Sequence, residues 1–283
     1  QGKRRRLAEK GVWTVNAARL QQAIDHHNAG RLDEATALYR QVIADEPDNA
    51  DALFLLGTIL TRRDQAGEAV AMLTRARDLA SDSADVHFAL GLALAETGDD
   101  AAATPCFGAA LELEPGFDDA RYRLAEALAD QGRGGDALEA LIPLAEINPG
   151  NLQAQLNIAA LALETGQLEI ARKAAEAAVR IDPDATPGKI LLGTAQRRRG
   201  DFESAVATLA EAAALAPDNP EPHYQRGRAL QELCRIDDAM TAYRAAVAAD
   251  GGYYPTILRN LTKARSGRVF LKISDLRRAL RGA

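Results

Sequence analysis

Alanine recurs at a fixed interval of 34 residues over most of this 283-residue chain. The series runs without a break through Ala35, Ala69, Ala103, Ala137, Ala171, Ala205 and Ala239. An interval this strict indicates a repeat array, in which each unit buries its apolar face against its neighbours. The repeat therefore constrains the fold more than the composition does.

Other residue types keep the same interval. Small residues lie twelve positions before the alanines, at Ala23, Gly57, Gly91, Ala125, Ala159, Gly193 and Gly227. Glycines follow seven positions later, at Gly30, Gly98, Gly132, Gly166 and Gly200. Prolines lie twelve positions after the alanines, at Pro47, Pro115, Pro149, Pro183 and Pro217. Counted from the start of each unit, these marks occupy positions 8, 15, 20 and 32.

The residues between these marks predict two helices in each unit. Apolar residues follow helical spacing, as in Leu53, Leu56 and Leu60. Glycine suits a sharp turn because it adopts positive φ without a steric cost. Proline cannot continue the second helix, so it favours a turn after it. The short side chains at positions 8 and 20 allow the two helices to approach closely.

These residues resemble the pattern of the tetratricopeptide repeat family over residues 16–253. The shared features are the period, the small residues, the large side chain at position 24 and the proline at position 32. The resemblance implies an all-α fold, a right-handed α-solenoid of about seven 34-residue helix-turn-helix repeats with C-terminal capping helices. The expected repeats are residues 16–49, 50–83, 84–117, 118–151, 152–185, 186–219 and 220–253. Position 4 departs from the family, because only Leu53 supplies the usual large apolar side chain there.

Both ends of the chain are basic. Residues 1–15 form a basic N-terminal arm with five basic residues and one acidic residue, and we expect little helical character there. Residues 254–283 are expected to form a cap helix and a basic amphipathic tail. Residues 256–283 carry a net charge of +7, and the whole chain carries −6. The repeats between the ends are therefore acidic, which favours a basic partner or the chain's own tail, or simply a solvated surface.

The resemblance places the working surface on the first helices of the repeats, which line a concave groove. Position 5 supplies an apolar and aromatic stripe along this groove, and charged residues surround it. The expected contact residues are Phe54, Phe88, Tyr122, Leu156, Ile190, Tyr224, Asp51, Asp85, Asp119, Glu126, Arg197, Arg198 and Arg228. Such a groove suits an extended or helical peptide whose apolar side chains lie on the stripe.

Motifs for catalysis and for cofactor binding are missing from the sequence. It has no phosphate-binding glycine loop, no nucleophile elbow and no paired cysteines with metal-ligand spacing, so we predict no enzyme, no cofactor and no metal site. Adjacent His26 and His27 point in different directions on a helix and suit a metal poorly. The acidic repeats argue against nucleic acid. The sequence contains no apolar run of 18 residues, so it predicts no membrane span.

The sequence thus predicts a non-catalytic protein–protein interaction scaffold, bacterial and cytoplasmic, that binds a peptide or partner segment in its groove. A periplasmic location, or a membrane anchor ahead of Lys3, stays open. One alternative is an interaction module of, or partner to, a sulfotransferase or glycosyltransferase. Another is a self-assembling scaffold, with self-association through the basic C-terminal tail. The third is a protein for envelope, secretion or pilus assembly.

Overall fold

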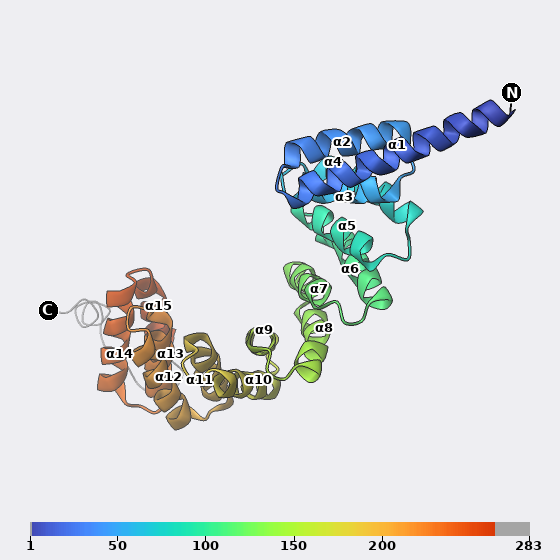
Figure 1. Ribbon diagram of the computed structural model, residues 1–283. Coiled ribbons are helices and arrows are strands. Elements are labelled where there is room, and N and C mark those ends of the chain that lie inside the picture. The colour runs from blue at the N-terminus through green and yellow to red at the C-terminus, as the bar shows by residue number, and fades with distance from the viewer. Residues whose placement is uncertain (1, 264–283) are drawn as a thin grey trace. The chain divides into compact units, whose positions relative to one another are not determined.

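Helices make up the regular structure of this chain. A computed structural model describes residues 2–263 (Figure 1), and within them fifteen helices form and no strand does. The predicted all-α fold is confirmed. The helices fall into two compact units, Gln1–Ala140 and Leu141–Ala283, and the division lies within α8 (Gly134–Ile147). The predicted C-terminal tail beyond residue 263 lies outside the described residues.

Unit 1 contains seven complete helices. They are α1 (Gly2–Asn28), α2 (Leu32–Asp45), α3 (Ala50–Thr61), α4 (Ala66–Leu79), α5 (Ala84–Glu96), α6 (Asp100–Leu113) and α7 (Asp118–Asp130). Helices α1 and α2, α3 and α4, and α5 and α6 pack as pairs, and each pair also contacts the next helix along the chain. The pairing is the one that the glycine and proline turns predict.

Unit 2 also contains seven complete helices. They are α9 (Leu152–Glu164), α10 (Leu168–Ile181), α11 (Thr186–Arg199), α12 (Phe202–Leu215), α13 (Pro220–Glu232), α14 (Ile236–Ala249) and α15 (Tyr253–Lys263). Helices α9 to α14 again pack as successive pairs, and α15 contacts both α13 and α14. Helix α15 therefore caps the last pair, as the sequence predicts for residues 254 onward.

Side chains at the helix starts and prolines after the helix ends set the boundaries. Asn49 accepts a hydrogen bond from the Ala52 backbone N–H at 3.0 Å, which satisfies a donor that the first turn of α3 would leave unpaired. Asn151 does the same for α9. Helix α2 ends at Asp45, two residues before Pro47. These local signals explain why the helix pairs keep the sequence period.

The turn between the two helices of a pair contains a residue in the left-handed region. Gly98 has a φ of 78° and Gly200 a φ of 93°, values that glycine adopts without a steric cost. Asp64 and Cys234 occupy the same place in the two pairs that lack the glycine, with φ values of 57° and 58°. The turn therefore keeps one geometry whichever residue it contains.

The start of α1 differs from the expectation. Residues 1–15 were expected to show little helical character, and this is wrong, because α1 begins at Gly2 and continues to Asn28. The segment contains no proline, and Arg, Lys, Leu, Ala and Glu all have good helix propensity. A helix already nucleated by packing against α2 extends through such residues at little cost.

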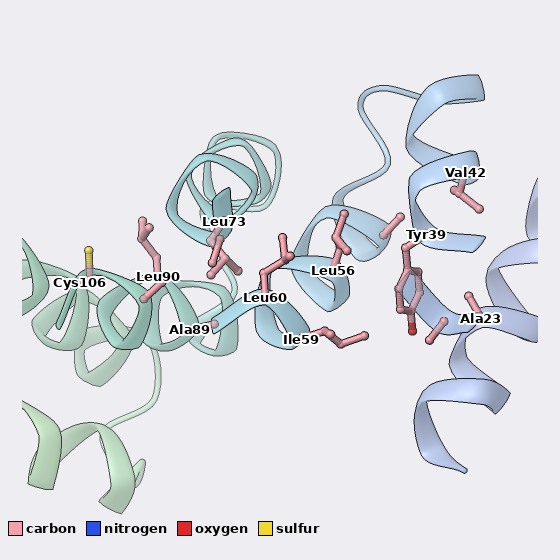
Figure 2. Close-up of a cluster of buried hydrophobic side chains, with 14 residues drawn as sticks. Ala23, Tyr39, Val42, Leu56, Ile59, Leu60, Leu73, Ala89, Leu90 and Cys106 are labelled. Atoms are coloured by element: carbon pink, nitrogen blue, oxygen red, sulfur yellow. The ribbon is translucent and has the colours of Figure 1, made fainter. Parts of the chain in front are cut away.

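The core of unit 1 is a continuous apolar cluster from α1 to α6. Figure 2 shows Leu56, Ile59 and Leu60 of α3 between the Tyr39 ring of α2 and Leu73 of α4. The Tyr39 side chain is fully buried, as are the three α3 side chains. Because the cluster spans several helix pairs, each pair is stabilised mainly by its neighbours.

Glycine at position 8 lets a large side chain approach the first helix. A Cβ added at Gly91 would lie 2.6 Å from the Phe107 ring, which packs directly against the α5 backbone. A Cβ at Gly227 would lie 2.5 Å from the Tyr243 ring. Position 8 thus meets position 24 of the same helix pair, which explains why the small and the large residues share one period.

Two glycine-to-alanine changes are therefore expected to have opposite effects. Gly91→Ala should lower the free energy of unfolding by about 1 kcal/mol, since an overpacking cost of roughly 1–3 kcal/mol exceeds the gain of about 1 kcal/mol in helix propensity. Gly108→Ala, in α6, should raise it by about 0.5–1 kcal/mol, because no atom lies within 4 Å of its added Cβ. Urea unfolding of both variants measures the two signs. An equal change in the free energy of unfolding of both variants would contradict the close contact between Gly91 and the Phe107 ring.

Candidate partner-binding surface

In unit 1 the predicted stripe consists of side chains that belong partly to the core. Phe54, Phe88 and Tyr122 lie on α3, α5 and α7, and each is half-buried. The Phe88 ring centroid lies 4.7 Å from that of Phe117 and 5.9 Å from that of Phe107. The Phe88 ring is thus held in place by packing, and part of each of the three side chains remains exposed.

The predicted acidic residues of unit 1 lie at the starts of the same helices. Asp51, Asp85 and Asp119 occupy the first turns of α3, α5 and α7, and all are exposed. A carboxylate in the first turn stabilises the helix through the positive end of its dipole. This placement explains why the acid recurs, and its exposure leaves it accessible to a cation.

A hollow opens between α5, the start of α6, and α7. Its volume is about 330 Å³, and Leu92 and Phe107 belong to its apolar lining. Four carboxylate residues surround this lining, with one arginine, Arg123. They are Glu96, Asp100, Glu126 and Asp130. The hollow thus combines an apolar lining with an acidic rim of net charge −3.

Only one of the four carboxylates is paired within the described residues. Arg123 Nη1 lies 2.8 Å from Glu126 Oε2, whereas no ion pair involves Glu96, Asp100 or Asp130. Gln131 ties α7 to the start of α6, because its Nε2 donates to the Asp100 carbonyl at 3.0 Å and to Thr104 Oγ1 at 2.6 Å. The rim is therefore held in position, and its unpaired carboxylates favour a positively charged group.

The stripe of unit 2 is less accessible than predicted. Leu156 of α9 and Ile190 of α11 are half-buried, but Tyr224 of α13 is only 8% exposed. The Tyr253 ring of α15 lies 5.3 Å from the Tyr224 ring, and Asn260 Nδ2 donates to the Tyr224 hydroxyl at 2.5 Å. The expectation that Tyr224 lies on an open wall is therefore wrong: α15 covers it, and it belongs to the core.

The three predicted arginines of unit 2 form a cluster, and the Glu232 carboxylate acts electrostatically on its Arg197. The Arg228 guanidinium lies over the Tyr224 ring, 5.7 Å from its centroid. Arg197 Nε donates to Gln225 Oε1 at 3.2 Å, and Arg198 donates to the Leu163 carbonyl. Among the ion pairs of the described part of unit 2, none includes these arginines.

Burial and the neighbouring charges shift the pKa of one arginine in the cluster. Burial lowers the pKa of the half-buried Arg197 guanidinium to about 10, and the charges of Arg228 and Arg198 act in the same direction. Folding therefore places Arg197 where its positive charge is disfavoured. An anionic group at this place would relieve the repulsion.

Comparison with models of protein families shows which family the chain belongs to. Two models, both described as tetratricopeptide repeat, match it, one at residues 26–92 and 196–259 and the other at 88–151 and 122–186. The chain belongs to the tetratricopeptide repeat family. None of the curated proteins compared with this chain matches it.

Solved structures with tetratricopeptide repeats show the same fold. YrrB, described as a TPR protein with an unusual peptide-binding site, is 20% identical with a TM-score of 0.58, over 65% of this chain and 95% of YrrB. PilF of Pseudomonas aeruginosa is 18% identical with a TM-score of 0.56, over 75% and 96%. The C-terminal part of a repeat protein from Cytophaga hutchinsonii is 12% identical with a TM-score of 0.68, over 84% and 98%. The tetratricopeptide repeat fold is a scaffold for protein–protein interaction.

The described part of this tetratricopeptide repeat chain contains no group of three or more His, Cys, Asp or Glu that could hold a metal ion. Across the same residues, no helix is both long and apolar enough to cross a membrane.

Cys106 is buried, and burial raises the pKa of its thiol. Its packing in the unit 1 core is consistent with a structural role.

Two features of the site were not predicted from the sequence. Asp100 joins the acidic rim although it belongs to a second helix, and its signal was the Asp99–Asp100 pair directly after the turn at Gly98. The covering of Tyr224 by α15 was also missed. Its signal was the pair Tyr253–Tyr254, which brings two large rings directly after the last repeat.

Proposed function

We propose that this chain is a non-catalytic scaffold that binds a peptide or segment of a partner protein along the first helices of its repeats. The observation that carries the proposal is the row of half-buried aromatic side chains at Phe54, Phe88 and Tyr122. Large rings that are fixed by packing yet partly exposed give contact area at little cost in conformational entropy. The hollow beside Phe88 adds a charged rim that selects the partner.

A capture experiment tests this surface. The parent chain and a Phe54→Ala, Phe88→Ala, Tyr122→Ala variant are used as bait in lysate of the source organism, after circular dichroism has shown equal helicity. We expect the variant to lose the proteins that the parent captures, with affinity reduced about tenfold or more, because aromatic anchors dominate such interfaces. Equal capture by both chains would reject the aromatic row as the working surface.

The chain offers a matched control for this experiment. Leu79, Leu113 and Ile147 lie near the ends of second helices and are 45%, 44% and 69% exposed. Changing all three to alanine removes a comparable number of apolar side chains from another part of the surface. We expect this control to capture the same proteins as the parent. Loss of capture by the control alone would move the binding surface to these helix ends.

The captured proteins also separate the finer alternatives. A sulfotransferase or glycosyltransferase would favour an interaction module of such an enzyme. A component of the envelope, of a secretion system or of a pilus would favour assembly. In each case the partner should bind through the aromatic row, so the variant provides the same check on every candidate.

A further inference from the structure

The hollow between α5, α6 and α7 has a chemistry that a second part of the same chain complements. Its acidic rim surrounds an apolar lining, and three of its four carboxylates form no ion pair within the described residues. A volume of about 330 Å³ is at the low end of the roughly 300–1,000 Å³ of binding pockets, so it admits one or two side chains of a segment. The matching occupant carries basic and apolar side chains together.

The C-terminal sequence has this composition. Residues 264–283 contain six basic residues and one acidic residue, interspersed with large apolar residues. Arg277 and Arg278, for example, stand between Leu276 and Leu280. The repeats carry the opposite charge, since the chain as a whole has a net charge of −6 despite its two basic ends. Charge complementarity of this kind steers association and fixes register.

We propose that the hollow of one copy receives the basic C-terminal segment, residues 264–283, of a second copy. The inference rests on the proposed function, because it uses the same wall of first helices as the binding surface. A basic side chain meets Glu96 and Asp130 at the rim, and an apolar neighbour covers Leu92 and Phe107.

The contact has a consequence for assembly. A tail in a hollow joins two different surfaces, so a joined pair of copies still has one free tail and one free hollow. Such a contact continues from copy to copy unless its rotation closes a ring. The assembly should therefore grow with concentration beyond a dimer.

Sedimentation of the full chain tests the inference. We expect a mean mass that rises with concentration in about 0.1 M salt and falls toward that of the single chain in about 1 M salt, because the Debye length shortens from about 10 to 3 Å. A chain that stays single at every concentration and salt level would overturn the inference. If that single chain still captures partners through the aromatic row, the proposed function stands and only the self-association fails.

Charge-reversal variants test separately whether the hollow and the C-terminal segment form the contact. The hollow variant is Glu96→Lys with Asp130→Lys, and the tail variant is Arg277→Glu with Arg278→Glu. We expect each variant alone to associate about tenfold more weakly than the parent, and an equal mixture of the two to recover association. The control is Glu112→Lys with Glu139→Lys, two exposed positions that do not line the hollow, and it should associate as the parent does.

The two variants, measured separately, decide which segment occupies the hollow. A hollow variant that associates as strongly as the parent would overturn the proposed site. A tail variant that associates normally, while the hollow variant does not, would show that another segment occupies the hollow and would overturn the tail. Circular dichroism of every variant confirms that the helices remain formed.

Discussion

Replacement of Phe107 by alanine is expected to lower the free energy of unfolding by about 3–5 kcal/mol. The Phe107 side chain is only 1% exposed, and its ring packs both against the α5 backbone at Gly91 and against the Phe88 ring. Alanine would leave a cavity between two helices that cannot close, because Gly91 has no side chain to fill it. The same change would remove part of the hollow's lining.

Urea unfolding and hydrogen exchange measure this effect and its extent. Repeats are stabilised by their nearest neighbours, so the amides of α5, α6 and α7 should lose the most protection. The matched control is Phe117→Ala, because Phe117 also contacts Phe88 but is only half-buried, and it should cost clearly less. A similar loss of protection throughout unit 1 would contradict the local origin of the effect.

Replacement of Arg197 by methionine is expected to raise the free energy of unfolding. Methionine keeps the apolar stem and removes a guanidinium that burial, Arg228 and Arg198 disfavour. Because the folded pKa, about 10, lies below that of the unfolded chain, the unfolded state binds more protons from about pH 10 upward. The folded state is therefore penalised fully at neutral pH, and the penalty shrinks as the pH rises through this range.

We expect Arg197→Met to raise the free energy of unfolding by roughly 1–2 kcal/mol near pH 7, a value reduced from the full pKa shift because the group is only half-buried. The gain should decrease above about pH 10, where the folded parent loses its proton. The control is Arg199→Met, which removes an exposed arginine paired with Glu169 and Asp201 and should cost a few tenths of a kcal/mol. Destabilisation by Arg197→Met at neutral pH would show that its bond to Gln225 outweighs the repulsion.

The all-α fold and the helix pairs could be predicted because several local signals share one period. Glycine in the turn, proline after the second helix and small residues at the crossing each act over a few residues, and each acts the same way in every unit. The close approach of Gly91 and Phe107 follows from the same logic, since position 8 and position 24 meet wherever the two helices pair.

The site was harder to predict, because it depends on how completely a neighbouring helix covers each side chain. Tyr224 has the same position as Phe88, and each ring meets an aromatic ring at the start of the next helix, yet Tyr224 is 8% exposed while Phe88 is only half-buried. The hollow needs Asp100 from a second helix beside Glu96 and Asp130 from two first helices. Sequence spacing alone does not show which neighbouring helix closes a surface and which leaves it open.

The left-handed turn has a consequence for tracing the ancestry of such arrays. Asp64 and Cys234 hold the same left-handed backbone conformation as Gly98, so the turn forms without glycine in these two pairs. The alanine at position 20 has no such freedom, because it is buried in every helix pair; Ala69 and Ala239, in the two pairs without the glycine, are 0% and 1% exposed. A sequence pattern that requires glycine at this turn excludes these two pairs, whereas one that requires the buried alanine fits all seven units.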